Sequence, residues 1–434
     1  MADGSPKTVL ILSQVYVPDP ASVGQHTADA AAQMAQRGHR VVVLTANRGY
    51  DDPSVKYEAH ETIDGVQVRR LPFSAFGKRS IALRLLGGVF FVIQCVMRGL
   101  FVRDLASILV STSPPMCPLA ALAIAAVRRT PITYWVMDIN PDQMVELGRI
   151  NERSLPARAF DWLNRRILGR ARDVIALDRF MAERINRKRD VRKKITIIPP
   201  WPHEDHLAVV SHEDNPFRRE HGLEGKFVLM YSGNHSIVHP VATLLEAAVR
   251  LKDEPRLVFM FIGGGLGKKD VERVIERERP GNIVSLPYQP LSSLKYSLSA
   301  ADVHLVSMGD AMVGIVHPCK AYGAMAVARP VLLLGPSPCH VSELIEAHEI
   351  GWTVSHGDVE GAVATIRNIL DTDPARLALI GARAREVIRT QLSKNALCGR
   401  FCTVLERGTN AVGTPSAATD ACLAATIPKD GPAS

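Results

Sequence analysis

Short apolar runs alternate with amphipathic stretches along the chain, and this alternation predicts the fold. Thr8–Ser13 is continuously apolar, as expected of a strand that is covered on both faces. A helical stretch over Thr27–Arg37 ends at Gly38, and Arg40–Thr45 is a second buried strand. A strand, a helix and a strand in this order form a βαβ unit, which predicts a parallel sheet.

The same pattern continues and then restarts in the second half of the chain. Polar residues and prolines gather over residues 199–216, where we place a domain boundary. We therefore predict an α/β fold of two doubly wound, Rossmann-like domains, residues 1–205 and 206–407, facing across a cleft that holds the ligand. Residues 408–434 are rich in Ala, Thr, Gly, Pro and Ser, which predicts a disordered tail.

Composition fits a globular protein of a reducing compartment. Of 434 residues, 47% are apolar and 22% are charged, which is ordinary for a soluble chain. The seven cysteines are scattered without a CxxC pair, as expected of reduced thiols in the cytoplasm. No apolar leader flanked by basic residues is evident at the start, so we expect no secretory signal.

Two stretches point to a surface partner. Residues 160–194 contain twelve Lys and Arg against five Asp and Glu, close to the whole net charge of +8. Such a patch attracts anionic lipid head groups, nucleic acid or acidic substrates, or it is a solvated helix face. Leu85–Met97 has no charged residue, and its 13 residues fall short of the roughly 20 that cross a bilayer. It is either a helix at a membrane interface or a buried helix.

Several kinds of chemistry lack their motifs. The first loop has no GxGxxG, and Thr45-Ala46-Asn47 offers no acid for a ribose, which argues against a dehydrogenase. GxSxG and HExxH are absent, which argues against the common hydrolases. Metal ligands do not cluster, so we expect neither a metal site nor a cofactor.

Phosphate recognition remains, and Lys320 is its strongest candidate. Pro318 predicts the start of a short helix, whose free N–H groups would point toward the loop Gly314–His317 and form an anion site to which His317 and Lys320 add donors. A second loop, Tyr231–His239, follows the first strand of the second domain and offers Gly233 and His239. The turn that contains Gly265 ends the next strand and faces the same cleft.

With these motifs in place, the chain resembles a family 4 glycosyltransferase of the GT-B fold, from the bacterial branch that builds surface polysaccharides such as colanic acid and O-antigen. The resemblance runs in order over about residues 7–405. It rests on Val17-Pro-Asp-Pro with Gly24, Arg37-Gly-His-Arg-Val-Val-Val, Ser113-Pro-Pro, Met137-Asp-Ile-Asn-Pro-Asp, Tyr231-Ser-Gly-Asn, Phe261-Ile-Gly-Gly-Gly, Pro287-Tyr-Gln-Pro, Ala301-Asp302 and the Pro318/Lys320 helix.

The resemblance implies a second domain that binds a nucleotide-diphosphate sugar and a first domain that binds the acceptor. Gly24 would lie under the diphosphate. Gly233, Asn234 and His239 fall where the family usually has an Arg and a Lys, and Lys320 would supply the charge instead. The family's two glutamates, eight residues apart, fall near Ile315 and at Gly323, so Asp310 would stand in at the sugar.

The implied reaction is attack of an acceptor hydroxyl on the anomeric carbon, with retention and without a bound metal. Lys320, His317 and the amides of Gly314, Ile315 and Val316 would stabilise the leaving diphosphate. Asp138 would lie near the acceptor hydroxyl as a base, or else cap a strand end. The expected donor is a UDP-sugar that provides a hexosyl or N-acetylhexosaminyl group, with Gly265 also in the donor site.

The expected acceptor is a lipid-linked saccharide or polysaccharide at the inner face of the plasma membrane, with no nucleic-acid partner. A C-terminal helix that crosses back to the first domain also belongs to this expectation. Two alternatives stay open: a GT-B sugar-nucleotide epimerase, and a catalytically silent GT-B scaffold subunit.

Overall fold

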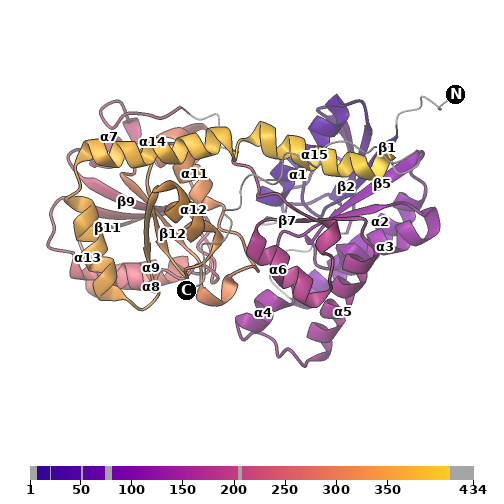
Figure 1. Cartoon of the computed structure of the whole chain (residues 1–434), viewed down its shortest axis with the longest axis horizontal. Coiled ribbons are helices and arrows are strands. Elements are labelled where there is room, and N and C mark those ends of the chain that lie inside the picture. The colour runs from indigo at the N-terminus through magenta and orange to yellow at the C-terminus, as the bar shows by residue number, and fades with distance from the viewer. Residues whose placement is uncertain (1–6, 20, 50–51, 74–80, 204–207, 411–434) are drawn as a thin grey trace, which may run out of the picture.

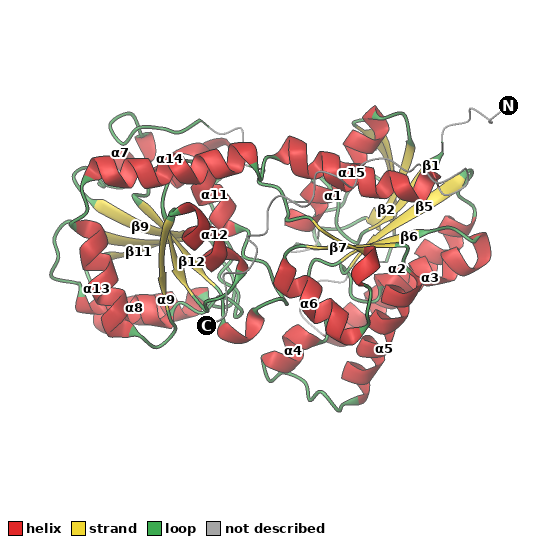
Figure 2. Ribbon diagram, viewed as in Figure 1, coloured by secondary structure: helices red, strands yellow, loops and turns green. Residues whose placement is uncertain are grey.

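Two domains, each built around a parallel sheet, make up the computed structural model (Figure 1). It describes residues 7–19, 21–49, 52–73, 81–203 and 208–410. In both domains the strands lie in the centre and helices cover the two faces of the sheet (Figure 2). The predicted architecture of two doubly wound domains is therefore confirmed.

The first sheet has the strand order β3-β4-β2-β1-β5-β6-β7-β8, and within it β3 alone is antiparallel to its neighbour. Its strands are β1 (Thr8–Leu12), β2 (Arg40–Ala46), β3 (His60–Ile63), β4 (Val66–Leu71), β5 (Leu105–Ser111), β6 (Ile132–Trp135), β7 (Asp173–Ala176) and β8 (Ile195–Ile197). The β3–β4 hairpin was missed. Asp64-Gly65 is its two-residue turn, and both residues have positive φ, as a type I′ turn requires.

Helices of the first domain form two layers. They are α1 (Ser22–Gln36), α2 (Ile81–Leu100), α3 (Cys117–Arg128), α4 (Asp142–Glu146), α5 (Leu155–Arg170) and α6 (Arg179–Lys188). On one face α3 packs between α2 and α5, whereas α1 lies on the other face beside the C-terminal helix. The predicted helix over Thr27–Arg37 begins five residues earlier, at Ser22, so that Gly24 falls in its first turn.

The second sheet is entirely parallel, in the order β11-β10-β9-β12-β13-β14. Its strands are β9 (Phe227–Ser232), β10 (Leu257–Ile262), β11 (Ile283–Leu286), β12 (Val303–Ser307), β13 (Val331–Leu334) and β14 (Gly351–Val354). Its helices are α7 (Pro216–Glu220), α8 (Ala242–Arg250), α9 (Lys268–Glu278), α10 (Leu294–Ser299), α11 (Lys320–Ala326), α12 (His340–His348), α13 (Val359–Leu370) and α14 (Pro374–Thr390). The strand order reverses between β9 and β12, which is where such sheets bind ligands.

The C-terminal helix α15 (Lys394–Asn410) leaves the second domain and packs on α1 and β5 of the first (Figure 1). Phe401 meets the rings of Trp135 and Trp201 edge-on, at 4.8 and 5.6 Å between ring centroids. Lys7 also donates from Nζ to the Thr409 carbonyl at 2.8 Å. The expected return of the last helix is confirmed. It runs three residues beyond the expected end at 407, and the rest of the predicted tail lies outside the described residues.

Half of the twelve basic residues in the stretch 160–194 form ion pairs within the protein. Arg165 and Lys188 bind Asp161, and Arg184 binds Asp142 and Glu146 of α4. These contacts favour the reading of this stretch as a solvated surface with internal ion pairs. Among the described helices, none combines the length and the apolarity that crossing a bilayer requires.

Candidate functional site at the domain boundary

The loops after β9 and β12 lie side by side at the switch point of the second sheet. The amide of Gly309, just after β12, donates to the carbonyl of Val238 in the loop after β9, at 3.0 Å. Glycine permits a further close approach, because a Cβ on Gly233 would lie 2.9 Å from Cε of Lys320. Its φ of +127° also disfavours any side chain at this position. The predicted neighbours Gly233 and Lys320 are therefore brought together.

Lys320 is a cation with no anion beside it. Its Nζ lies 5.3 Å from the centre of the Tyr231 ring. Within the described chain it has neither a carboxylate nor a hydrogen-bond acceptor. Burial lowers its pKa to about 8, since little water surrounds the charge. A charged group held in this way is suited to receive an anionic ligand.

Burial and the charge of Lys320 lower the pKa of two histidines in the loop after β9. Burial, and then Lys320, lower the pKa of His239 to about 3. Burial, Lys268 and Lys320 lower that of His235 to about 4. Both rings are therefore neutral at pH 7. Among the described residues, Nδ1 of His239 is buried without a hydrogen-bond partner, and the ring nitrogens of His235 are buried beside the backbone of Gly233 and Gly264.

His235 was not predicted from the sequence. Its ring packs against Tyr231, at 4.5 Å between centroids, and its backbone joins two loops: its amide donates to Gly264 and its carbonyl accepts from Gly267. A Cβ on Gly265 would lie 2.3 Å from the side-chain oxygen of Asn234, so these two predicted residues also meet. In the sequence, only its position directly after Asn234 indicates that His235 belongs to the candidate site.

Asp138 faces the second domain from the carboxyl end of β6. Its amide donates to the hydroxyl of Thr112 at 3.2 Å, and the next amide, that of Ile139, donates across the boundary to the carbonyl of Ile315. Its carboxylate has no partner among the residues that the structure describes. Burial raises its pKa to about 6, so it titrates close to neutrality.

The loop before α11 does not offer its amides as predicted. The amides of Ile315 and Val316 both donate to the carbonyl of Met312, at 3.0 and 3.2 Å. Gly314 is covered by the first domain, since a Cβ there would lie 2.6 Å from the carbonyl oxygen of Phe180. These contacts argue against the predicted role of the loop amides in holding a phosphate. The helix itself, with seven residues, is short.

His317 is also engaged within the protein. Its Nδ1 lies 2.8 Å from Oδ2 of Asp178, and its Nε2 lies 2.6 Å from the hydroxyl of Tyr322. Since both nitrogens have protein partners, the ring has no donor left for a leaving group. These two contacts argue against the predicted direct contact between His317 and the diphosphate.

Gly24 and Asp310 lie on opposite sides of the boundary. Gly24 is buried in the first turn of α1, where a Cβ would lie 3.2 Å from the backbone of Tyr16. Asp310 is exposed at the start of the 3₁₀ turn Asp310–Met312, which approaches α4 of the first domain. Among the described residues, no group of three or more His, Cys, Asp or Glu could hold a metal ion.

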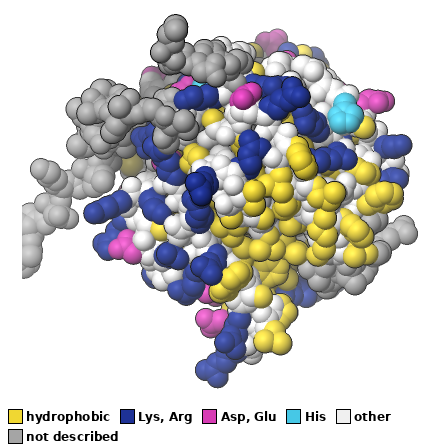
Figure 3. Space-filling model, turned by 90° about the vertical axis from the view of Figure 1, so that its right-hand side faces the viewer, with side chains coloured by type: hydrophobic (Ala, Val, Ile, Leu, Met, Phe, Trp, Pro, Cys, Tyr) yellow, Lys and Arg dark blue, Asp and Glu magenta, His cyan; other side chains and the backbone are white. Residues whose placement is uncertain are grey.

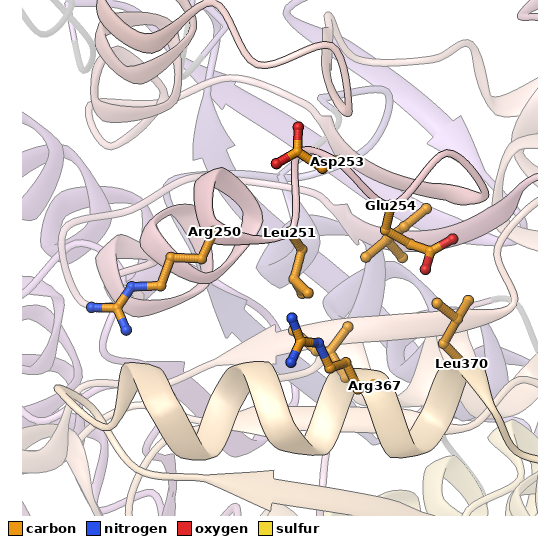
Figure 4. A pocket seen from close by; sticks show the side chains of 8 residues that line it. Arg250, Leu251, Asp253, Glu254, Arg367 and Leu370 are labelled. Carbon is orange, nitrogen blue, oxygen red and sulfur yellow. The ribbon is translucent and has the colours of Figure 1, made fainter.

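Two cavities lie elsewhere, near the amino ends of the strands of the second domain. One, of about 240 Å³, lies between α8 and α13 (Figure 4). Its Arg250 is paired with Glu246 and Glu360. The other, of about 630 Å³, includes Asp302 and Arg329. Because such sheets bind ligands at the carboxyl ends of their strands, the boundary near Lys320 is the better candidate.

Comparison with known proteins decides the family. Residues 22–201 match the glycosyl transferase 4-like domain, and residues 213–386 match glycosyl transferases group 1. The chain belongs to the family 4 glycosyltransferases. The first matched region contains strands β2 to β8 and the second contains β9 to β14, so one match falls in each domain.

Its relatives in sequence are distant. A putative colanic acid biosynthesis glycosyl transferase of Escherichia coli, WcaI, is 25% identical over 83% of this chain and 92% of its own length. The probable glycosyltransferase WbjE of Pseudomonas aeruginosa is 26% identical over 62% of this chain and 66% of its own.

Solved structures share the fold at lower identity. Anabaena HepE in complex with UDP and glucose matches with a TM-score of 0.68 and 15% identity, over 92% of this chain and 99% of that one. WaaG, a glycosyltransferase involved in lipopolysaccharide biosynthesis, matches with a TM-score of 0.67 and 16% identity, again over 92% and 99%. Both therefore support the GT-B fold that the sequence predicted.

Proposed function

We propose that this glycosyltransferase binds the diphosphate of its sugar donor at Lys320 and transfers the sugar to a lipid-linked saccharide. The observation that carries the proposal is the unpaired, partly dehydrated ammonium group of Lys320 beside Gly233 at the switch point. A diphosphate is the anion that a glycosyltransferase of this family has to hold. Its charge grows as the glycosidic bond breaks, so a fixed cation lowers the barrier.

The neighbouring residues supply the remaining roles. His239 and Asn234 are proposed donors of hydrogen bonds to the phosphates, with Gly233, Gly265 and Gly24 leaving room for them. Asp138, whose pKa lies near 6, is the proposed group beside the acceptor hydroxyl. Asp310 is the proposed contact to the donor sugar, because the usual glutamate position is occupied by Ile315. We propose retention of the anomeric configuration and no bound metal.

UDP is the first nucleotide to test. The related fold of HepE has been solved with UDP-glucose, which supports UDP as the carrier here. The sugar is proposed to be a hexosyl or N-acetylhexosaminyl group. WcaI, named for colanic acid biosynthesis, supports a surface polysaccharide as the destination.

A lipid-linked acceptor is supported by one face of the first domain. Exposed apolar side chains recur on α2 at helical spacing, namely Leu86, Val89, Phe90, Ile93 and Met97, and Phe101 and Val127 extend them. Figure 3 shows an apolar area bordered by Lys and Arg on the side where α2 and α3 lie. No acidic residue occurs in α2 or α3, whereas Arg98, Arg128 and Arg129 lie at their ends. An anionic lipid surface matches this face, because it offers an apolar interior for the exposed side chains and negative charge for the arginines.

The proposed location is the cytoplasmic face of the plasma membrane. The six cysteines in the described part of the chain are free thiols, which suits a reducing compartment. A peripheral position is supported by the face of α2.

A donor screen tests the function. The protein is incubated with UDP-, GDP- and ADP-sugars in the presence of EDTA, and released nucleotide is measured without acceptor. We expect slow release from one donor, and the configuration of the freed sugar, followed by NMR, reports retention or inversion. Binding of no nucleotide sugar would contradict the proposal and favour a silent scaffold, whereas interconversion of the donor sugar would favour an epimerase.

A further inference from the structure

A chain of four polar side chains, of which Asp178, His317 and Tyr322 are buried, crosses from the first domain to the second. Asp178, at the start of α6, contacts Nδ1 of His317 at 2.8 Å, and Nε2 of His317 contacts the Tyr322 hydroxyl at 2.6 Å. The same hydroxyl lies 2.9 Å from Nε2 of His340. Tyr322 lies on α11, the helix that begins at Lys320, so this chain joins the first domain to the helix that carries the proposed donor cation.

The hydrogen bonds along this chain have a consistent direction. Burial alone would raise the pKa of Asp178, but the hydrogen bond that its carboxylate accepts from His317 outweighs burial and lowers that pKa. The ionised carboxylate can only accept, so Nδ1 of His317 donates to it and Nε2 is free to accept from Tyr322. The Tyr322 oxygen then accepts from His340. Each contact thus has one donor and one acceptor, which fixes the orientation of His317.

Two further contacts hold the same segment on the first domain. The carbonyl of Ile315 accepts from the amide of Ile139, and Gly314 lies against the carbonyl of Phe180. The side chains of Met312, Ile315 and Val316 belong to one apolar core with residues of the first domain. The segment that leads into Lys320 is therefore shaped by the first domain as much as by its own.

We propose that His317 is a positioning residue through which the first domain holds Lys320 in its binding position. The inference rests on the proposed role of Lys320 in donor binding. The segment that contacts the first domain also carries Lys320. Donor binding at Lys320 and the contact between the two domains are therefore thermodynamically linked. His317 touches no donor; it acts on the donor through Lys320.

The same boundary offers a matched control. Arg179, next to Asp178, forms an ion pair with Glu343 across the two domains, and both side chains are exposed. Exposed ion pairs contribute little because water and salt screen them. Glu343→Gln therefore removes a contact between the domains without disturbing the buried chain.

The test is UDP binding by calorimetry to the full-length protein and its variants. We expect His317→Ala to weaken UDP binding about tenfold, roughly 1.4 kcal/mol, and Glu343→Gln to change it less than about twofold. His317→Asn, whose amide can still donate to Asp178, should weaken binding less than His317→Ala. Equal losses in these two His317 variants would contradict the role of the Asp178 contact.

The deciding measurement is made in a Lys320→Ala background. If His317 acts through Lys320, adding His317→Ala there causes no further loss of UDP affinity. An equal, additive loss in both backgrounds would overturn the inference. If His317→Ala does not fold, as judged by thermal unfolding, Tyr322→Phe removes only a hydroxyl and enters the same cycle. Failure of the wild type to bind UDP, GDP or ADP would instead count against the proposed function.

Discussion

At the scale of single residues, the candidate site is defined by charges and ring nitrogens that lack partners. The sequence marked Lys320 because of its neighbours Gly314 and Pro318, but it could not tell that no anion lies beside it. That fact depends on Tyr231 and Gly233, which come from a loop almost ninety residues earlier. From the sequence, His317 was an equally suitable ligand for the diphosphate, yet its Nδ1 is hydrogen-bonded to Asp178 of the other domain.

Lys320→Ala is expected to lower UDP affinity and turnover at least about tenfold, because the diphosphate loses its fixed cation. Lys252→Ala, at an exposed position after α8, is the control. The pH dependence has a definite sign: the free ammonium has a pKa of about 8 and bound diphosphate would raise it. Affinity should therefore be full below pH 8 and fall above it. Calorimetry at pH 8.5 in buffers of different ionisation enthalpy should show proton uptake in the wild type and not in Lys320→Ala.

Asp138 is expected to control the acidic limb of the pH–rate profile. If its carboxylate is the group beside the acceptor, activity falls as pH drops through about 6, and Asp138→Asn lowers turnover strongly at pH 7.5. Its effect on stability has the opposite direction. Since the folded pKa is raised above the ordinary value, the buried charge destabilises the fold above pH 6 and no longer does so below pH 4. Asp138→Asn should raise the unfolding temperature at pH 8 but not at pH 3.5; an unchanged temperature at both would show that the carboxyl is well solvated.

At the scale of elements, helix α2 is apolar both on its buried face and on its exposed face. Phe91 and Cys95 are fully buried toward the sheet, whereas Phe90 and Ile93 are exposed. The sequence predicted a helix here and left both a buried and an interfacial reading open. The structure indicates that one face of α2 is buried and that the opposite face is exposed. Apolar residues lie all round the helix, but the rest of the domain can cover only one side of it.

The exposed face of α2 gives a direct prediction for membrane binding. Replacing Phe90 and Ile93 by Ser should weaken co-sedimentation with vesicles that contain phosphatidylglycerol, because two anchoring side chains are lost. Leu379→Ser, at an exposed site on α14 of the second domain, is the control. Wild-type binding should also decline when phosphatidylglycerol is replaced by phosphatidylcholine. Unchanged sedimentation of the α2 variant would show that this face does not meet lipid.

At the scale of the whole molecule, Asp29 joins the two segments that connect the domains. Its carboxylate accepts from Nε1 of Trp201 at 2.9 Å and from Lys394 at 2.8 Å, and His203 lies 3.4 Å away. Trp201 and His203 belong to the linker after the first sheet, and Lys394 begins the returning helix. One residue of α1 thus contacts both segments that connect the domains, which favours a fixed orientation of one domain relative to the other.

Asp29→Asn should therefore lower the thermal unfolding temperature at pH 7. Burial alone would raise the pKa of Asp29, but hydrogen bonds from His203, Lys394 and Trp201 together lower it well below its usual range. A lowered pKa stabilises the fold above the unfolded value near 3.8 and stops doing so in acid. The difference from the wild type should thus shrink toward pH 3. Asp270→Asn, in an exposed pair with Arg273, is the control; equal effects of the two substitutions would contradict the bridging role.

The order of apolar runs, by itself, determined the parallel strands of the two sheets and most of their helices, because period and burial are local properties of the sequence, whereas the return of the last helix was expected from the family resemblance. It also determined which loops end at the switch point. Only the tertiary structure decided which polar groups are free: it gave His317 a carboxylate from another domain and left Lys320 and His235 without one. The physical reason is that a hydrogen-bond partner can lie more than a hundred residues away, as Asp178 does from His317.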